Sequence, residues 1–449
     1  MSEADLRVAI VGGGVLGMTL ALRLREEGLR PLIVEAAPSP GGLASSDDIG
    51  SYRWDRFYHV ILRSDGELLQ LLDELGLGGL LRWGYTRTAC YADGGFHPLT
   101  TSLDFLRFPP LGPVQKARLA ATIVYASRLR DWRGLEGETA ADWLIRWSGR
   151  GTYERLWLPL LRSKLGDNAE HASAAFIWAI IARMYAARRS GLKREMFGYV
   201  DGGYELILRR FRAHLEHAGI EFMCGSAVSH VRSVPDAVSI RLEDGTELDA
   251  DAALLTVPCS RIAGLCPDLG SVERERLGRV VYQGIVCPSL LLRQPLAGNY
   301  ITSITDPGVP FTAVIEMTAL VDRERFGGRT LVYLPRYLTQ DSALWTWSDA
   351  DIVERFIDGL LRMYPHLRAS DVVSWRVGRA RDVLALSTLH YSRDALPPMR
   401  TSLPGVFVVN GAQIVAGTLN VNETVALANR QAAAFLRLTR DRDPVAATA

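Results

Sequence analysis

A glycine-rich turn near the N-terminus joins a short apolar segment to a helical one, and this arrangement restricts the fold more than any other feature of the chain. Residues 8–11 are consecutive apolar residues, as in a buried parallel strand. Residues 18–27 are helical in character, and residues 12–17 between them have the pattern G-x-G-x-x-G. The order of strand, glycine turn and helix predicts an α/β fold with a parallel sheet.

The glycines of this turn are spaced as a dinucleotide requires. Gly12 allows the tight turn, Gly14 lets the backbone approach a pyrophosphate, and Gly17 allows the helix to pack closely. Val15 and Leu16 lie in the same turn, just before the predicted helix, whose first backbone N–H groups are unpaired. We therefore predict that a phosphate group binds at this helix N-terminus.

An acidic residue follows at the distance expected for a ribose contact. The apolar residues 31–34 end at Glu35, which lies 18 positions beyond Gly17, and Ala36 comes next. A carboxylate here accepts hydrogen bonds from ribose hydroxyls and repels the 2′-phosphate of NADP. We expect Glu35 and Ala36 to border the adenosine ribose of a dinucleotide other than NADP.

A second glycine motif, Gly41-Gly42-Leu43-Ala44, begins six residues after Glu35. With the first motif it resembles the double fingerprint of the GR2-type flavoprotein superfamily, which contains amine oxidases, protoporphyrinogen oxidases, phytoene desaturases and UDP-galactopyranose mutases. The resemblance implies FAD as cofactor and a Rossmann-like FAD-binding domain interleaved with an α+β substrate domain. In many relatives an arginine follows the paired glycines. Leu43 stands there in this chain, so that contact to the cofactor is made by the backbone or lost.

The C-terminal part resembles the closing motif of the same superfamily. Residues 406–411 read as a strand that ends in glycine, and residues 422–438 read as a helix whose N-terminus would point at the flavin pyrimidine ring. The helix dipole would favour negative charge on the flavin as it is reduced. The further cofactor contacts that the resemblance implies are Val228 on the adenine side and Gly411, Leu419, Asn420 and Val421 on the flavin side.

We expect the two domains to alternate along the chain. The predicted FAD-binding segments are residues 1–85, 201–280 and 396–440. The predicted substrate-domain segments are residues 86–200, which are mainly helical, and residues 281–395, which are mainly sheet; residues 441–449 are a flexible tail. Within them we predict a hairpin at 88–98, a helix at 153–164 and a strand at 331–337.

Composition excludes several classes of partner. The 51 Lys and Arg residues nearly equal the 50 Asp and Glu residues, so net charge does not direct the chain toward nucleic acid.

The acidic N-terminus is unlike a secretion signal, and we expect a cytoplasmic protein. The five cysteines have no metal-ligand spacing. No segment is apolar enough to span a membrane, although residues 172–187, with basic residues after them, are also compatible with contact at a membrane surface.

Two residues are the main catalytic candidates. His59 lies in an aromatic loop beside Tyr58, which in relatives passes the isoalloxazine, and we interpret it as a general base or flavin contact. The alternative is a loop histidine bonded to backbone. Lys164 ends an apolar segment, where it could hold a water against the flavin or bind an anionic substrate. The alternative for Lys164 is that it complements a helix C-terminus.

Three further residues have weaker support. Arg56 and Arg336 are additional pocket candidates. Glu316 would be a poised carboxylate if it faced the substrate, but we favour a solvated residue at the end of a strand.

The leading hypothesis is an FAD-dependent oxidoreductase that removes hydride from a small-molecule C–H bond next to oxygen, nitrogen or a conjugated system. The alternative is a redox-neutral mutase or isomerase of a nucleotide sugar, for which Arg183, Arg188, Arg189 and Arg194 would hold the pyrophosphate. No second G-x-G-x-x-G follows a strand, so we expect no separate NADPH domain, and the electron acceptor stays open.

Overall fold

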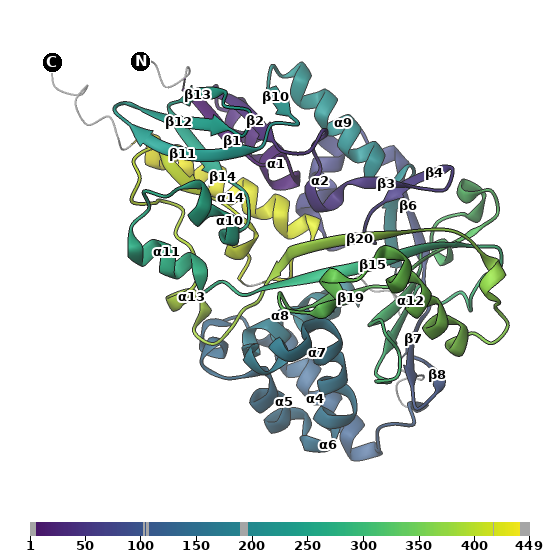
Figure 1. The fold of residues 1–449 in the computed structure, drawn as a ribbon. Coiled ribbons are helices and arrows are strands. Elements are labelled where there is room, and N and C mark those ends of the chain that lie inside the picture. The colour runs from purple at the N-terminus through teal and green to yellow at the C-terminus, as the bar shows by residue number, and fades with distance from the viewer. Residues whose placement is uncertain (1–5, 102–103, 105–106, 189–195, 416, 441–449) are drawn as a thin grey trace.

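The computed structural model describes residues 6–101, 104, 107–188, 196–415 and 417–440 (Figure 1). It begins with the predicted strand, turn and helix, β1 (Arg7–Val11) and α1 (Val15–Glu26). The helix starts three residues before the predicted position, because Gly14 acts as its N-cap and the Met18 N–H already donates to the Gly14 carbonyl at 2.9 Å.

Five parallel strands form the sheet that contains β1, in the order β10-β2-β1-β14-β21. The other members are β2 (Arg30–Glu35), β10 (Glu221–Cys224), β14 (Ala252–Leu255) and β21 (Val406–Val408). These strands come from three separate stretches of sequence, so the chain leaves the sheet and returns to it twice. The predicted α/β class with a parallel sheet is confirmed.

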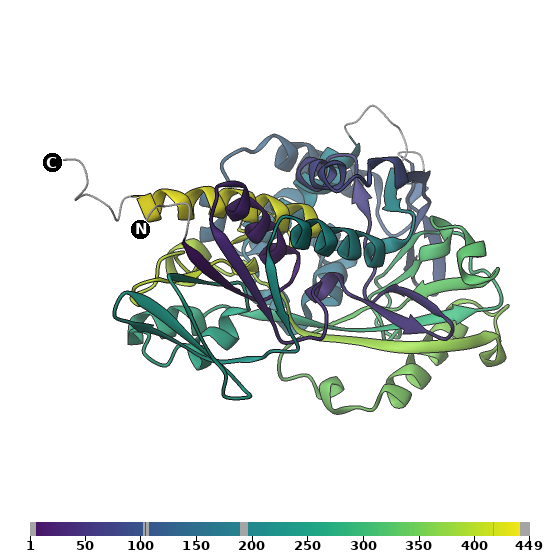
Figure 2. The ribbon, with the colours of Figure 1, turned by 90° about the horizontal axis from the view of Figure 1, so that it is seen from above.

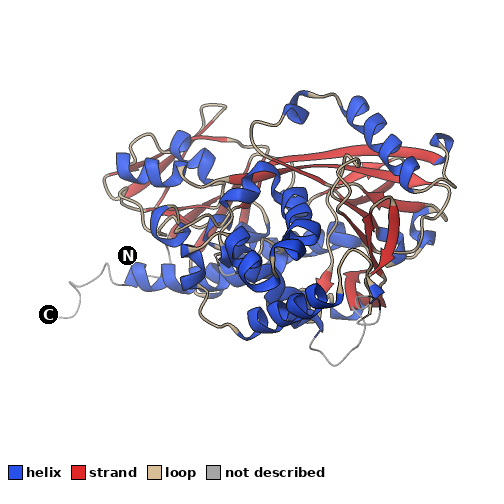
Figure 3. Cartoon of the chain, turned by 90° about the horizontal axis from the view of Figure 1, so that it is seen from below, coloured by secondary structure: helices blue, strands red, loops and turns tan. Residues whose placement is uncertain are grey.

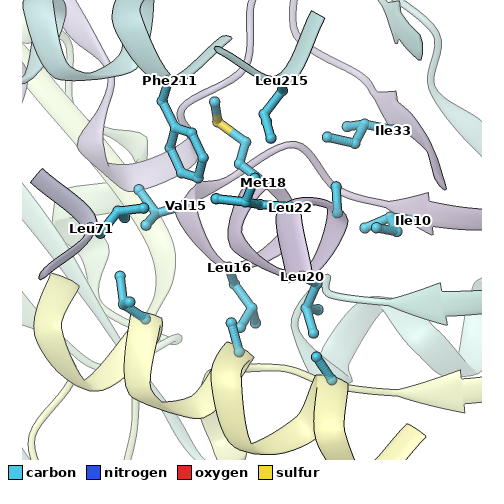
Figure 4. Packing of buried hydrophobic residues seen from close by; sticks show 14 of the residues in the cluster. Ile10, Val15, Leu16, Met18, Leu20, Leu22, Ile33, Leu71, Phe211 and Leu215 are labelled. Atoms are coloured by element: carbon cyan, nitrogen blue, oxygen red, sulfur yellow. The ribbon is translucent and has the colours of Figure 1, made fainter. Parts of the chain in front are cut away.

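The core of this part surrounds α1. Figure 4 shows Leu16 and Leu20 pointing toward the helix α14 (Val421–Arg440), and Met18 pointing toward Phe211 and Leu215 of α9 (Gly203–His217). Met18 and Leu20 are completely buried. Burial of each such side chain contributes about 1.5–3 kcal/mol, so the contacts on both sides fix α1 and the turn that precedes it.

An antiparallel meander follows α9 and β10. Its strands are β11 (Val228–Val234), β12 (Ala237–Leu242) and β13 (Glu247–Ala250), and the two short helices α10 (Cys259–Leu265) and α11 (Ser271–Gly278) come after β14. The turn between β12 and β13 uses Gly245 at φ +89°, a conformation that glycine adopts without strain.

A second, larger sheet has the order β19-β15-β18-β17-β16-β7-β8. Its strands are β7 (Thr88–Ala92), β8 (Gly95–Pro98), β15 (Tyr282–Leu292), β16 (Ile301–Ile304), β17 (Ala313–Glu316), β18 (Thr330–Tyr333) and β19 (Arg336–Leu338). The central strand β15 is buried along its whole length. The predicted hairpin at 88–98 is present as β7 and β8, which pair antiparallel.

Two features of this sheet differ from the prediction. The strand β20 (Val372–Ala385), which pairs antiparallel with β15, was not predicted, since charged side chains such as Arg376 and Arg379 interrupt its alternation. The single strand predicted at 331–337 is wrong and is two strands, β18 and β19. Pro335 lies between them and cannot donate a ladder hydrogen bond.

Helices cover both faces of the second sheet. On one side lies a helical layer formed by α4 (Pro113–Arg128), α5 (Ala140–Ser148), α6 (Arg150–Thr152), α7 (Leu158–Leu165) and α8 (Ala174–Arg188). On the other side lies α12 (Asp349–Met363), as Figures 2 and 3 show. The predicted helix at 153–164 opens with a π-helical turn, Tyr153–Trp157, because Pro159 has no N–H for the normal ladder.

Short elements complete the described structure. They are the hairpin β3 (Ser46–Ile49) and β4 (Tyr52–Asp55), the sheet of β5 (Ile61–Leu62), β9 (Met196–Val200) and β6 (Leu81–Tyr85), and the helices α2 (Gly66–Glu74) and α13 (Tyr391–Asp394). Arg189, Arg194 and the predicted tail 441–449 lie outside the described residues. Within the described ranges no helix combines the length and hydropathy of a membrane span, and no cluster of His, Cys, Asp and Glu could hold a metal.

Candidate cofactor and active site

The first glycine motif forms a turn that only glycine can make at two of its positions. Gly12 has φ +112°, and a Cβ there would lie 2.4 Å from Thr256 Oγ1. A Cβ on Gly17 would lie 2.0 Å from the Gly12 carbonyl oxygen. Both contacts are impossible for a real Cβ, so these two glycines hold α1 close to the end of β1.

Gly14 differs, because it faces open space. A Cβ on Gly14 would meet only Gly42 Cα, at 3.9 Å, and Gly14 has an ordinary backbone conformation. The second glycine motif lies directly against it, since the Gly41 N–H donates to the Gly13 carbonyl at 2.9 Å and Gly14 and Gly41 form a β-bridge. The two motifs therefore frame one cradle.

The start of α1 supplies donors to this cradle. Val15 and Leu16 have buried side chains, so only their backbone can face a ligand. In the described structure the helix ladder begins with the Met18 N–H, and Gly14 provides no side-chain cap. The first-turn N–H groups and the open space at Gly14 fit a pyrophosphate.

Glu35 is held at the carboxyl end of β2. Its Oε2 accepts the Gly13 N–H at 2.6 Å and its Oε1 accepts the Ala37 N–H at 2.8 Å. Each carboxylate oxygen can accept a second hydrogen bond, so the group retains capacity for ribose hydroxyls. Ala36 is exposed beside it. These positions fit the adenosine ribose of a dinucleotide.

The residues predicted to contact the adenine and the flavin lie on two further segments. The Ser226 N–H donates to the Glu35 carbonyl at 2.9 Å, which places the start of β11, with Val228, beside the end of β2. At the other end, Asn420 caps α14 by accepting the Glu423 N–H at 3.0 Å. The helix begins at Val421, one residue before the predicted start at 422.

Gly411 and Leu419 lie together near this helix start. A Cβ on Gly411 would be 3.5 Å from Leu419 Cδ1, which is ordinary van der Waals contact. Ala44 is buried, whereas Gly42 is exposed and Leu43 is partly buried. At the paired glycines only backbone atoms therefore face the cradle, since Leu43 stands where many relatives have an arginine.

His59 is a partly buried, neutral histidine in the loop after β4. Burial lowers the pKa of His59 to about 4, and its Nδ1 finds no hydrogen-bond partner among the described residues. Its ring centroid lies 4.7 Å from that of Tyr204. A base with so low a pKa is weak at neutral pH, which favours the role of a cofactor or substrate contact over that of a general base.

Lys164 lies in an aromatic environment at the end of α7. Its Nζ is 5.8 Å from the centre of the Tyr337 ring, and the Tyr337 hydroxyl lies 3.0 Å from the Tyr58 hydroxyl. Burial lowers the pKa of Lys164, and the nearby Arg183 adds to this effect. No carboxylate pairs with Lys164 in the part of the chain that the structure describes. The ammonium is therefore available to a substrate or a water.

The structure adds two residues that sequence patterns did not indicate. Tyr204, the second residue of α9, has a buried hydroxyl without a described partner, and Tyr337 lies on β19, the second of the two strands into which the predicted strand 331–337 divides. The only signal for Tyr204 was the preceding pair Gly202-Gly203, both of which have positive φ. For Tyr337 we find none.

The weaker candidates lie elsewhere. Arg56 forms a two-point ion pair with Asp47, at 2.7 and 2.9 Å. Glu316 is 4% exposed and accepts the Leu296 and Gly298 N–H groups, so the expectation of a solvated residue is wrong. The Glu316 carboxylate thereby holds the loop that contains Leu296 and Gly298 against the end of β17.

The arginines invoked for a nucleotide sugar give that alternative little support. Arg183 is paired with Asp65, at 3.2 Å between Nη2 and Oδ1. The side chain of Arg188 is not described, and the other two arginines lie outside the described ranges.

Comparisons with known proteins show the same fold. Coproporphyrinogen III oxidase of Bacillus subtilis (strain 168) is 22% identical over 306 residues, which are 61% of this chain and 64% of that protein. Thus the chain matches less than two thirds of that relative. Wild-type putrescine oxidase bound to putrescine superposes with a TM-score of 0.73 at 17% identity, covering 96% of this chain and 99% of the other. Reduced UDP-galactopyranose mutase has a TM-score of 0.75 at 16% identity, covering 96% of both chains.

The family assignment comes from a match along most of the sequence. The sequence profile described as "Flavin containing amine oxidoreductase" covers residues 17–420. It confirms, at the level of the family, the flavin cofactor, FAD, and the oxidoreductase class that the glycine motifs and their resemblance predicted. The chain belongs to the flavin-containing amine oxidoreductase family.

Proposed function

We propose that this protein removes hydride from a C–H bond of a small molecule, next to oxygen, nitrogen or a conjugated system, and passes it to bound FAD. One observation carries the proposal. The Tyr204 ring contacts the His59 ring in a tilted arrangement, and Leu208, one helical turn later on α9, lies 2.7 Å from where a Cβ of Gly41 would be. One turn is about 5.4 Å, so Tyr204 and His59 lie beside the cofactor cradle.

Each part of the site has a defined task. The N–H groups at the start of α1 hold the pyrophosphate, Glu35 holds the ribose, and the N-terminus of α14 favours negative charge on the flavin ring. FAD supplies the hydride acceptor when bound. His59 contacts the flavin or substrate through an uncharged imidazole, and Lys164 holds a water or a polar atom of the substrate.

The surroundings of Lys164 favour a neutral or weakly charged substrate. Tyr58 and Tyr337 present aromatic surface, and the core of the helical layer next to them is apolar, with buried Trp157 and Leu161. A compact anion would instead need several free cations. Coproporphyrinogen and putrescine, which the names of two relatives print, are the first compounds to test because those relatives are named oxidases. Both compounds are charged at neutral pH, so they test the oxidoreductase class and not the preference for a neutral substrate.

The mutase alternative rests on fold alone. UDP-galactopyranose mutase has a similar TM-score to the oxidases, but at 16% identity this shows only the fold. Nothing in the described site provides the free arginines that a nucleotide-sugar pyrophosphate needs.

We also propose a cytoplasmic location. All five cysteines are free and four are buried, which suits a reducing compartment.

The deciding experiment uses FAD-loaded protein under anaerobic conditions, mixed with coproporphyrinogen III, with putrescine or with UDP-galactopyranose. An oxidoreductase loses its visible flavin absorbance with substrate alone and regains it with oxygen or a dye. A product of unchanged mass that forms only after dithionite treatment would overturn the proposal and support the mutase.

A further inference from the structure

A second cavity lies on the opposite face of the substrate sheet from Lys164. Neighbouring residues of a strand point to opposite faces, so Arg336 and Tyr337 of β19 project in opposite directions. Tyr337 faces Lys164, whereas Arg336 lines a cavity of ≈ 500 Å³ between the sheet and α12. Figure 2 shows α12 on the side of the long strands away from the helical layer.

The charged lining of this cavity is mainly basic. It contains Arg336, Arg355 and Arg362 against a single carboxylate, Asp358. Arg336 Nε is buried without a hydrogen-bond partner in the described structure, and Arg362 donates only to the Gly308 carbonyl, at 3.2 Å. Within the same described ranges no ion pair joins any of the three arginines to Asp358. The three guanidinium groups thus outnumber the single carboxylate of the lining, and none of them is neutralised by a direct ion pair in the part of the chain that the structure describes.

The uncharged lining is apolar and aromatic. Trp347, Phe356, Leu344 and the prolines at 307 and 310 contribute to it, and the Arg355 guanidinium lies 5.7 Å from the Trp347 ring centre. A volume of this size is typical of sites for small molecules. The combination of planar apolar surface and arginine side chains suits a ligand with an apolar body and an anionic group.

A neighbouring hollow limits where the anion can lie. That hollow shares Trp347, Arg355 and Asp358 with the cavity, but its other charged residues are Asp351 and Glu354. These carboxylates would repel an anion. The anionic group is therefore confined to the side of the cavity that Arg336 lines.

We propose that this cavity is a second binding site, which takes a small organic anion. Its carboxylate or phosphate contacts Arg336 and Arg355, and its apolar body packs against Trp347 and Phe356. The site is separate from the cofactor and from the proposed reaction, and it stands whether or not the proposed function is correct.

Calorimetric titration of FAD-loaded protein with benzoate and with phenyl phosphate tests the site, because bound FAD fills the pyrophosphate cradle. We expect saturable binding of at least one probe and binding of neutral benzyl alcohol that is weaker by about tenfold or more, as expected for lost charge-assisted hydrogen bonds. The tighter of the two anions identifies the ligand as a carboxylate or a phosphate.

Variants on the exposed side of α12 locate the binding without disturbing the sheet. Arg355→Ala should weaken binding by about tenfold or more, while Asp358→Asn should strengthen it by removing a repulsive charge. Arg274→Ala, an exposed arginine of α11 that does not line the cavity, is the matched control and should change nothing. Absence of saturable binding, equal binding by Arg355→Ala, or weaker binding by Asp358→Asn would overturn the proposal.

Discussion

The glycines of the cradle have two different roles, and the space around each α-carbon shows which role a glycine has. Gly12 and Gly17 are required by the protein itself, because a side chain would overlap Thr256 or the backbone. Gly14 is different, because no protein atom crowds the position that its side chain would occupy. We propose that this space holds the cofactor pyrophosphate, so substitutions at these positions should separate folding from cofactor binding.

We predict that Gly14→Val folds but does not retain FAD. Its backbone is compatible with any residue, and the branched side chain would occupy the pyrophosphate position. The matched variant Gly17→Ala should instead lose stability by about 1–3 kcal/mol or more, the usual cost of overpacking. Flavin absorbance per protein and urea unfolding measure the two effects. Full flavin content in Gly14→Val would contradict the position of the cradle.

We predict that His59 lowers stability in acid. Its pKa in the folded protein is about 4, against 6.5 when exposed, so the unfolded chain binds the proton more tightly. Stability present above pH 6.5 is lost as the pH falls toward 4, by about 3 kcal/mol in total. In His59→Gln this part of the pH dependence should disappear from urea-unfolding curves. A variant curve parallel to the wild-type curve would mean that His59 is solvated and protonated normally.

Among the elements, those with strong local signals could be predicted from the sequence and those that depend on partners could not. The glycine turn, the helix α9 and the meander around Gly245 follow from apolar periodicity and turn residues. The strand β20 carries arginines that become acceptable only when β15 and Asp55 lie beside it, as Arg376 shows by donating to the Asp55 carbonyl. No local pattern contains that information.

We predict that Asn420 determines the start of α14. Its side chain caps the helix through the Glu423 N–H, so Asn420→Ala should cost about 1 kcal/mol of stability. Asn420→Asp should restore the cap, but its negative charge at the proposed flavin edge should make the flavin harder to reduce. Urea unfolding and the flavin reduction potential separate the two effects. An unchanged potential in Asn420→Asp would place the helix N-terminus away from the flavin.

For the molecule as a whole, the candidate site exists only because distant segments meet. His59 and Lys164 could be predicted from residue type and neighbours, whereas Tyr204 and Tyr337 come from elements more than a hundred residues apart in the chain. Which aromatic side chains surround a lysine depends on how the substrate sheet lies against the helical layer. The predicted domain boundaries and the roles of these residues stay predictions.

Asp55 connects the parts on which this arrangement depends. The carboxylate accepts the Tyr204 N–H at 2.8 Å, and its backbone carbonyl accepts the Tyr333 hydroxyl at 2.6 Å and the Arg376 guanidinium. One residue thus joins β4, α9, β18 and β20. It is 2% exposed, and burial raises its pKa from 3.8 to about 7.

We predict that Asp55 makes the folded protein less stable as the pH rises. The folded state holds the Asp55 proton more tightly than the unfolded chain, so stability is complete below pH 3.8 and is lost as the pH rises through about 7. The shift corresponds to about 4 kcal/mol. Asp55→Asn keeps an acceptor for the Tyr204 N–H and cannot ionise. Relative to wild type, it should therefore gain stability progressively from about pH 4 to about pH 8, which urea unfolding of the FAD-loaded protein measures. A loss of stability that grows with pH would instead show that the carboxylate is ionised and paired with Arg376, which would make the contact between β4 and β20 an ion pair.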